Sequence, residues 1–294
     1  MIQMRSQLLN AGIRLFGTAP FDQNDLIDCG AKKLLPKGAQ AVIVCALPYY
    51  IESSLKENSH WENCPSDNSP PEPSVQGTCL RNIARYAVAR DYHTVVMEML
   101  KQACAALKSR YKAQFVPFVD NSPIKEVRAA VRAGLGMLGR NGLLITREYG
   151  SYCFIGEIVT DYPFKTTNHF AACEDCGRCV NACPGDVLRD QPCGGPDGVF
   201  REGGFDKLSC ASYISQKKGE LTLREREIIK KSGLIWGCDI CQDVCPHNKN
   251  PKITYIQAFT QDLLPVITEE NALEACKTRA FGYKGPQPLI RNLS

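Results

Sequence analysis

The chain has 294 residues, of which 44 % are hydrophobic and 22 % are charged, and its formal net charge is +4. This composition is typical of globular proteins and argues against disorder, and the length suffices for one large core or for two domains. The N-terminus lacks the apolar segment of a secretory signal, and the longest apolar run, residues 41–50, is too short to span a bilayer. We therefore expect a cytoplasmic protein, whose mildly basic charge permits a polyanionic partner without requiring one.

The N-terminal part of the chain alternates helical and strand patterns. Residues 3–17 have apolar residues at helical spacing, and the run AVIVCAL, residues 41–47, is typical of a buried strand. Residues 51–76 are rich in Ser, Pro, Asn and Glu and predict a long surface loop. The patterns that follow predict, in order, a long helix or helix pair at 80–107, a strand at 114–119, a helix at 122–134 and a strand at 151–160. This alternation predicts a sheet with helices packed on its faces.

The sequence FVDNSP, residues 118–123, holds the best candidate for catalysis in this part. Asp120 follows an apolar strand and precedes a helix, which is where ligands usually bind in α/β sheets. An apolar pocket there would raise the pKa of the carboxyl and let it donate a proton near neutral pH. Ser122 would cap the helix, with Pro123 at its first position. The alternative is that Asp120 only forms an N-cap or an Asx turn.

Two cysteine motifs organise the C-terminal part. Seven of the 16 cysteines fall in these motifs, which favours metal-bound thiolates in a reducing compartment over a secreted disulfide framework. The first cysteine motif has the C-x2-C-x2-C-x3-C-P spacing of bacterial ferredoxins that hold two 4Fe-4S clusters, and it consists of Cys173, Cys176, Cys179, Cys183 and Pro184. The second cysteine motif is shorter and consists of Cys238, Cys241, Cys245 and Pro246.

Two clusters need one more thiolate than the two motifs supply. Cys210 lies between the motifs and is the natural candidate, with Cys193 as the alternative. Because the fourth cysteine of such a motif ligates the other cluster, we expect one cluster on Cys173, Cys176, Cys179 and Cys245. The other cluster is then expected on Cys183, Cys210, Cys238 and Cys241. Zinc is the alternative metal, since C-x2-C pairs also suit tetrahedral sites. A third cysteine within each motif, with a proline directly after the motif, favours iron and sulfide.

The order of the motifs along the chain resembles a known family. IARYAVARDYH, FVDNSP, AGLGMLGRNGLLI, GSYCFIGEI, the first cysteine motif, CASYISQKKG and WGCDICQDVCPHN follow one another over roughly residues 5 to 250. Together they resemble the epoxyqueuosine reductases, which are cobalamin-dependent iron–sulfur enzymes related to reductive dehalogenases. The resemblance implies an α/β (α+β) corrinoid-binding domain, similar to the nitroreductase type, followed by a bacterial two-cluster ferredoxin-like domain.

The resemblance also implies site residues and domains. The proton donor of the family falls on Asp120, and its cobalamin contacts fall on Asp120, Leu144, Ile155, Ser212 and Asp239. The family binds its corrinoid without a histidine ligand, so we expect His93 to be packed or hydrogen-bonded. The implied domains are 1–165 for cobalamin binding and catalysis, 166–252 for the two clusters, and 253–294 as a short C-terminal extension. We expect a short form without the C-terminal helical-repeat domain of many relatives.

The implied reaction is the reduction of epoxyqueuosine to queuosine in tRNA, with electrons from an external flavodoxin or ferredoxin and no membrane partner. A basic surface would suit tRNA, and its candidates are Lys217, Lys218, Arg224, Arg226, Lys230, Lys231, Lys249 and Lys252. The alternative is a solvated helix, because Glu225 and Glu227 alternate with the arginines and TLRE forms a capping box. Two other functions stay open: a corrinoid-dependent reductase of a small molecule, and a two-cluster electron-transfer protein without a tRNA substrate.

Overall fold

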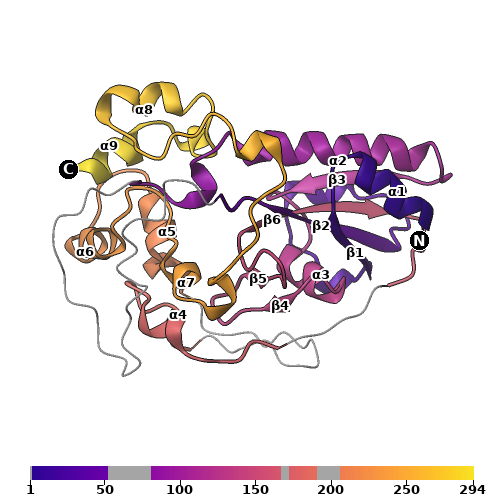
Figure 1. Ribbon diagram of the computed structural model, residues 1–294, viewed down its shortest axis with the longest axis horizontal. Helices are drawn as coiled ribbons and strands as arrows, with labels where there is room; N and C mark the ends of the chain where they lie inside the picture. The colour runs from indigo at the N-terminus through magenta and orange to yellow at the C-terminus, as the bar shows by residue number, and fades with distance from the viewer. Residues whose placement is uncertain (1, 52–80, 167–171, 191–205) are drawn as a thin grey trace. The chain divides into compact units, whose positions relative to one another are not determined.

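The computed structural model describes residues 2–51, 81–166, 172–190 and 206–294 (Figure 1). The predicted loop at 51–76, apart from Ile51, and the alternative ligand Cys193 lie outside these ranges. The chain divides into two compact units that interleave along the sequence. The first unit is mainly Met1–Pro48 and Tyr92–Glu174, and the second is mainly Tyr49–Asp91, Asp175–Pro192 and Glu202–Ser294. The domains expected at 1–165, 166–252 and 253–294 stay a prediction, and the compact units differ from them in grouping residues 49–91 with the cysteine-rich part.

The first unit is built on a four-stranded antiparallel sheet. Its strands are, in spatial order, β1 (Leu15–Pro20), β2 (Ala41–Pro48), β6 (Cys153–Thr160) and β3 (Phe115–Val119), and every neighbouring pair is antiparallel. The predicted strands at 41–47, 114–119 and 151–160 are confirmed. All of β2 is buried, which explains its unbroken apolar run. The mixed α/β class is also confirmed, with the antiparallel pairing of an α+β domain.

Strand β1 was not predicted. Helix α1 (Ile2–Asn10) ends shortly before Gly12, whose φ of +77° lies in the left-handed region that favours glycine. The chain then turns back and pairs with β2 from Leu15 onward. The helical prediction for residues 3–17 is therefore wrong in its last residues, because the apolar spacing was followed past the glycine that ends the helix.

Helices cover both faces of this sheet, as predicted. Helix α2 (Tyr92–Lys108) packs on β3 and β6 with α1 beside it, and helix α3 (Glu126–Arg132) packs on β1, β2 and β6 (Figure 1). The predicted helix or helix pair at 80–107 is a 3-10 turn, η3 (Arg85–Ala87), followed by α2. Gly156 of β6 lets α2 approach closely, since a Cβ there would lie 2.9 Å from Leu100 Cδ1.

Helix α3 begins later than predicted, and a short hairpin follows it. The N-cap of α3 is Lys125, whose side chain forms no capping bond, so the prediction that Ser122 caps the helix is wrong. The Ser122 hydroxyl instead accepts a hydrogen bond from the Ile124 N–H at 3.1 Å and donates one to the carboxyl of Glu157. After α3, the strands β4 (Met137–Leu138) and β5 (Leu144–Ile145) pair with each other.

The second unit consists of short helices around two small apolar cores. Its helices are α4 (Arg178–Asn181), α5 (Ala211–Ser215), α6 (Leu223–Ser232), α7 (Ile240–Asp243), α8 (Glu269–Ala275) and α9 (Gln287–Leu293). Trp236 and Phe281 centre one core, which includes Ile83 and Leu289, and Ile214 of α5 packs on α6 in the other. None of the helices in the described ranges combines the length and apolar character that crossing a bilayer demands.

Two close backbone approaches in the second unit require glycine. A Cβ on Gly185 would lie 1.8 Å from the carbonyl oxygen of Ser209, so the chain after Cys183 runs directly against the chain before Cys210. Gly237 has a φ of +72°, and a Cβ there would lie 2.4 Å from the Ala84 Cβ. These contacts fix the backbone beside three of the predicted cluster ligands, which are Cys183, Cys210 and Cys238.

Leu100→Ala tests the packing of α2 on the sheet. Leu100 is fully buried, and its removal should lower the free energy of unfolding by about 2–5 kcal/mol, since it leaves a cavity against β6. Leu34, which is 56 % exposed in the same unit, provides the control, and Leu34→Ala should cost less than about 0.5 kcal/mol. Urea denaturation followed by circular dichroism measures both. Equal losses would contradict this packing.

Candidate functional site

Asp120 lies directly after β3 in a backbone conformation that is unusual for a residue with a side chain. Its φ is +55°, in the left-handed region, where Asp is tolerated better than most residues. The Tyr92 hydroxyl donates a hydrogen bond to Asp120 Oδ2, and His93 Nε2 lies 2.8 Å from the same oxygen. This contact is of the packed or hydrogen-bonded kind expected for His93, and the absence of a cobalt bond stays a prediction. The carboxyl side chain stays 38 % exposed, so a ligand can reach it.

The two partners of Asp120 are held by aromatic stacking. The Tyr92 ring stacks on Phe154 of β6, with centroids 4.0 Å apart and an interplanar angle of 6°, and it stacks on His93 at 4.1 Å. Both partners come from the first turn of α2, so the helix and the sheet together fix the geometry around Asp120. Sequence reasoning singled out the histidine of DYH and missed Tyr92 beside it.

Leu144 and Ile155 lie in one apolar cluster of the first unit. Leu144 of β5 is buried there, and Ile155 of β6 packs against the cluster while staying partly exposed. Phe118, two residues before Asp120, belongs to the same cluster. The structure therefore places Leu144 and Ile155 in the same apolar cluster as Phe118, which lies near the end of β3. The role of Asp120, Leu144 and Ile155 as cobalamin contacts stays a prediction.

Two carboxyls with raised pKa values near Asp120 were not foreseen, the buried Glu157 and the partly buried Glu126. Glu157 of β6 is 1 % exposed, and burial raises its pKa to about 8, although the bond from Ser122 works in the opposite direction. Burial also raises the pKa of Glu126, at the start of α3, to about 8, and the nearby carboxyls of Glu157 and Asp120 add to that shift. The sequence signal for this group of carboxyls was Glu157, the single acid in the apolar strand CFIGEIVT.

Four predicted ligands of one cluster interact with one another in the second unit. Burial raises the pKa of Cys241 well above its ordinary value, and the thiols of Cys238, Cys210 and Cys183 raise it further. Burial likewise raises the pKa of Cys238 to about 12, with Cys210 and Cys183 contributing. Three chain segments thus bring four thiols within electrostatic range. This donor set fits a cluster, whose iron would supply the positive charge that stabilises thiolates.

The ligands predicted for the other cluster lie on separate segments, and the structure relates only some of them to one another. Cys179 of α4 is near Cys241 of α7, since its thiol also affects the pKa of Cys241 and the two helices pack together. Cys245 follows α7 directly, at the start of the 3-10 turn η5 (Pro246–Asn248). Cys173 belongs to the first compact unit and the other three to the second, so this set stays a prediction. Within the described ranges, no three His, Cys, Asp or Glu side chains are placed to hold a single metal ion.

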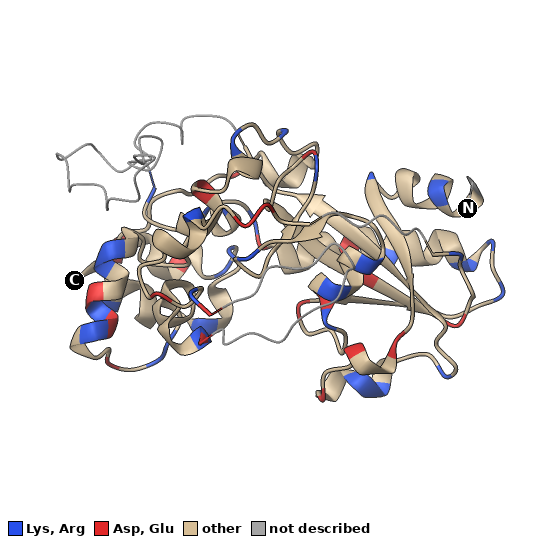
Figure 2. Ribbon diagram, turned by 90° about the horizontal axis from the view of Figure 1, so that it is seen from below, with Lys and Arg blue, Asp and Glu red and all other residues tan. Residues whose placement is uncertain are grey.

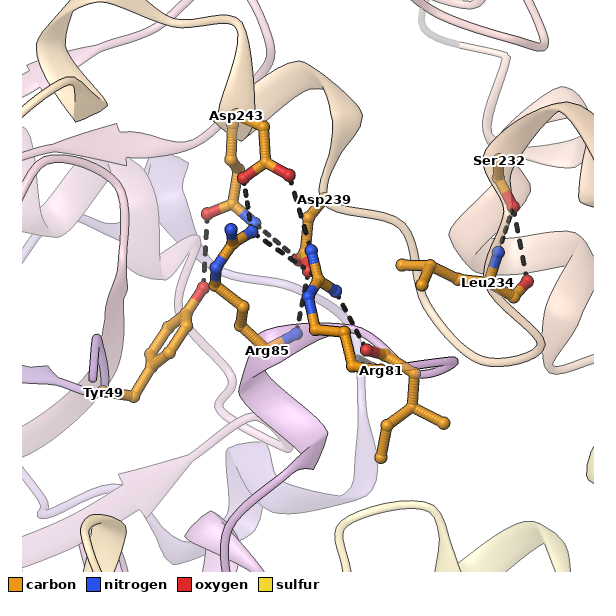
Figure 3. Close-up of polar contacts among 9 residues, drawn as sticks. Tyr49, Arg81, Arg85, Ser232, Leu234, Asp239 and Asp243 are labelled. Carbon is orange, nitrogen blue, oxygen red and sulfur yellow. Dashed lines mark hydrogen bonds and ion pairs between the residues drawn. The ribbon is translucent and has the colours of Figure 1, made fainter. Parts of the chain in front are cut away.

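A buried ion-pair network surrounds Asp239, next to Cys238 (Figure 3). Arg81 Nη1 lies 2.6 Å from Asp239 Oδ2, and the Arg85 backbone N–H donates to the same oxygen at 2.8 Å. The Arg85 guanidinium also pairs with Asp243, one turn of α7 further on, and Arg81 Nη2 lies 3.5 Å from Asp243 Oδ2. Tyr49 joins the network through Gln242, whose side-chain carbonyl accepts the Tyr49 hydroxyl at 3.2 Å.

This network limits how Asp239 could contact cobalamin. The Asp239 side chain is 1 % exposed and already satisfied by two arginines, so a cobalamin contact at this position would use the backbone. Ser212 lies in α5, partly buried, and its carbonyl oxygen accepts bonds from Ser215 and Gln216. Both residues remain predicted contacts.

Helix α6 carries the densest group of the predicted basic residues (Figure 2). Its Thr222–Glu225 capping box is present, as predicted, and Glu225 also pairs with Lys217. Arg226 pairs with Glu220 at 2.6 Å. Arg224, Lys230 and Lys231 are exposed and form no ion pair with another residue in the described ranges. The helix is therefore a solvated helix with ion pairs, and it also presents three exposed cationic side chains that a polyanion could bind.

Arg81→Met tests the buried network. Removing Arg81 should cost about 3–5 kcal/mol of unfolding free energy, because it takes the nearer of two guanidinium partners from the buried Asp239 carboxylate and leaves only Arg85, 3.7 Å away. Combining it with Asp239→Asn should cost clearly less than the sum of the two single changes. The control is Arg189→Met, whose side chain is 70 % exposed in its pair with Asp186 and should cost less than about 1 kcal/mol. Additive losses in the double variant, measured by urea denaturation, would refute the coupling.

Comparison with known proteins places the chain in a family. Residues 30–121 match the family model described as epoxyqueuosine reductase QueG, DUF1730, and residues 172–248 match that of the 4Fe-4S double cluster binding domain. An epoxyqueuosine reductase of Listeria monocytogenes is 32 % identical over 271 residues, covering 88 % of this chain and 64 % of that protein. One of Lactococcus garvieae is 33 % identical over 223 residues, covering 72 % and 60 %. The chain thus spans about three fifths of the length of these curated relatives.

A solved structure shares the fold. The crystal structure of an epoxyqueuosine reductase with an epoxyqueuosine-modified tRNA-Tyr stem loop matches with a TM-score of 0.76 and 23 % identity, covering 99 % of this chain and 79 % of that one. The match includes both the sheet-containing unit and the cysteine-rich unit. From the sequence matches and the family models together, the chain belongs to the epoxyqueuosine reductase family.

Proposed function

We propose that this protein is an epoxyqueuosine reductase, which reduces the epoxide of epoxyqueuosine in tRNA to the alkene of queuosine. The main observation behind this proposal is the placement of Asp120, whose accessible carboxyl is held at the end of β3 by Tyr92 and His93. Family membership, the double cluster binding domain and the structure of a relative with a modified tRNA stem loop support the proposal. A tRNA substrate would place the enzyme in the cytoplasm.

The electron-transfer centres would be held by this chain's own thiols. The sets predicted are Cys173, Cys176, Cys179 and Cys245 for one cluster and Cys183, Cys210, Cys238 and Cys241 for the other, with the mutual perturbation of the second set as support. An external low-potential flavodoxin or ferredoxin would supply the electrons. Cobalamin is proposed next to Asp120, where the partly exposed Ile155 and the apolar cluster around Leu144 suit a large macrocycle. When bound, a reduced corrinoid supplies the low-potential electrons that cleave the carbon–oxygen bond.

Asp120 would supply the proton that this cleavage needs. Conversion of an epoxide to an alkene takes two electrons and two protons and releases the oxygen as water, so an acid must stand at that oxygen. Tyr92 and His93 hold Asp120 Oδ2 and leave Oδ1 for the substrate. Since the His93 side chain is 34 % exposed, it also connects the carboxyl with solvent for reprotonation.

Asp120→Asn tests the acid. In protein reconstituted anaerobically with iron, sulfide and cobalamin, the change should lower turnover of epoxyqueuosine-containing tRNA by about 10²-fold or more, with eight irons and cobalamin still bound. The control is Asp28→Asn, an exposed acid of the same unit, which should keep normal turnover. Near-normal turnover of Asp120→Asn would reject the role. Protein that never takes up cobalamin would instead indicate a two-cluster electron carrier.

A second candidate function, reduction of a small molecule, is favoured by the ion pairs that partly neutralise the basic helix, Lys217–Glu225 and Arg226–Glu220. The free epoxyqueuosine nucleoside separates the two functions. An enzyme that acts on tRNA should prefer the stem loop to the nucleoside, and one that acts on small molecules should turn over the nucleoside equally well.

The salt dependence of tRNA binding tests the basic surface. Lys230→Gln combined with Lys231→Gln should weaken binding and reduce the slope of log K against log salt by about 0.7–0.9 for each phosphate that these lysines neutralise in the wild type. The control is Lys277→Gln, which should leave the slope unchanged, since Lys277 lies just after α8 and is paired with Glu274 of that helix. Fluorescence anisotropy with a labelled stem loop measures both. An unchanged slope in the double variant would remove α6 from the interface.

A further inference from the structure

Glu157 is a carboxylic acid placed in the middle of an apolar sheet. It pairs with Val44 of β2 and Phe118 of β3, and both partners belong to the apolar cluster that lies under α3. Cross-strand partners point to the same face, so the Glu157 side chain lies on the α3 face with them. Burying a carboxyl that is 1 % exposed in such surroundings is costly unless the carboxyl is hydrogen-bonded or protonated.

The one hydrogen bond of this carboxyl among the described residues reaches the Asp120 loop, residues 119–125. Ser122 is 4 % exposed, and its hydroxyl donates to Glu157 Oε2. The same hydroxyl accepts the Ile124 N–H at 3.1 Å, which closes the turn after Asp120. Glu157 Oε1 makes no hydrogen bond within the described ranges. The acid therefore contacts the loop through a single side chain.

The loop needs such an anchor because its conformation is strained. Asp120 is left-handed, and the Asn121 N–H bonds back to the Val119 carbonyl at 2.7 Å. Tyr92 and His93 hold the loop by its Asp120 side chain, which the substrate must also reach. Ser122 holds it from the buried side, two residues further on.

We propose that the Glu157–Ser122 pair positions the Asp120 loop for proton delivery. Glu157 acts through Ser122 and the intervening backbone and does not touch the substrate, so it is a positioning residue. The inference rests on the proposed function for its catalytic consequence, whereas the anchoring itself is a property of the protein alone.

The charge state of Glu157 gives the anchor a pH dependence. The groups that face it are Glu126 of α3, the Ser122 hydroxyl and, through the sheet, the Cys45 thiol of β2, whose pKa is raised by burial, by Cys104 and by Glu157. With a folded pKa of about 8 against an ordinary 4.5, Glu157 is mostly protonated at neutral pH. The Ser122 bond by itself favours the carboxylate, but burial among apolar side chains outweighs it. The stabilising contribution of neutral Glu157 is therefore present at low pH and is lost as the pH rises through about 8, when a carboxylate would be buried beside Glu126.

Hydrogen exchange of the peptide covering residues 119–125 tests the pair in the reconstituted protein without substrate. After correction for intrinsic exchange, protection in the wild type should fall about tenfold between pH 7 and pH 9, in step with the neutral fraction of Glu157, which falls from about 0.9 to about 0.1 for a pKa of about 8. Glu157→Gln should abolish that fall, and Ser122→Ala should lower protection at both pH values. The control is Ser109→Ala, because the Ser109 hydroxyl bonds only a local carbonyl, that of Ala106, at 2.8 Å.

Turnover supplies the second readout. The wild-type kcat should decline above pH 8, Glu157→Gln should shift or remove that decline, and KM for the stem loop should change little in either protein. Unchanged protection at 119–125 in Ser122→Ala, or a persistent pH step in Glu157→Gln, would overturn the inference. Since exchange needs no substrate, a protein that shows the expected exchange but no epoxyqueuosine turnover would refute the proposed function and leave the positioning pair intact. Denaturation midpoints identify any variant that fails to fold.

Discussion

The pairing of β6 with two neighbours is the constraint on which the first unit depends. As the strand between β2 and β3, β6 has its backbone groups bonded on both sides, so its side chains alternate between two fixed faces. Gly156 admits α2 on one face, and Glu157 lies under α3 on the other. Phe154 of the same strand stacks on Tyr92, which reaches Asp120. A shift of one residue in the register of β6 would exchange these faces and separate every one of these groups from its partner.

The described residues of the second unit contain no sheet and are held in place in another way. Its helices are short, so helix propensity contributes little, and its order comes from close backbone contacts and a buried charge network. Gly185 and Gly237 let chain segments approach beside Cys183, Cys210 and Cys238, and the ion pairs around Asp239 fix the start of α7. Such rigidity suits an electron-transfer centre, which works best when its ligands hardly move between oxidation states.

Features that depend on local pattern were predictable, and those that depend on contacts between distant segments were not. The buried strands, the capping box of α6 and the cysteine spacings are local, and the first two are confirmed. The order of motifs was enough to identify the family, which the matches confirm. Ser122 was misassigned because its acceptor, Glu157, is 35 residues away. Arg81 and Arg85 are four residues apart, as are Asp239 and Asp243. Nothing in the sequence shows that the two arginines form ion pairs with the two aspartates.

The meeting of those two pairs has a consequence for how the protein is made. Arg85 and Asp239 are separated by 154 residues in the sequence. At the usual pace of the ribosome, on the order of ten seconds or more passes between the synthesis of one and the other. During this interval the two arginines of the nascent chain lack their native acidic partners. The segment that carries them therefore stays solvent-exposed or bound to chaperones. The ion pairs of the cysteine-rich unit therefore form only after Asp239 and Asp243 have been synthesised, and a cluster that uses Cys238 and Cys241 can be assembled only after that point.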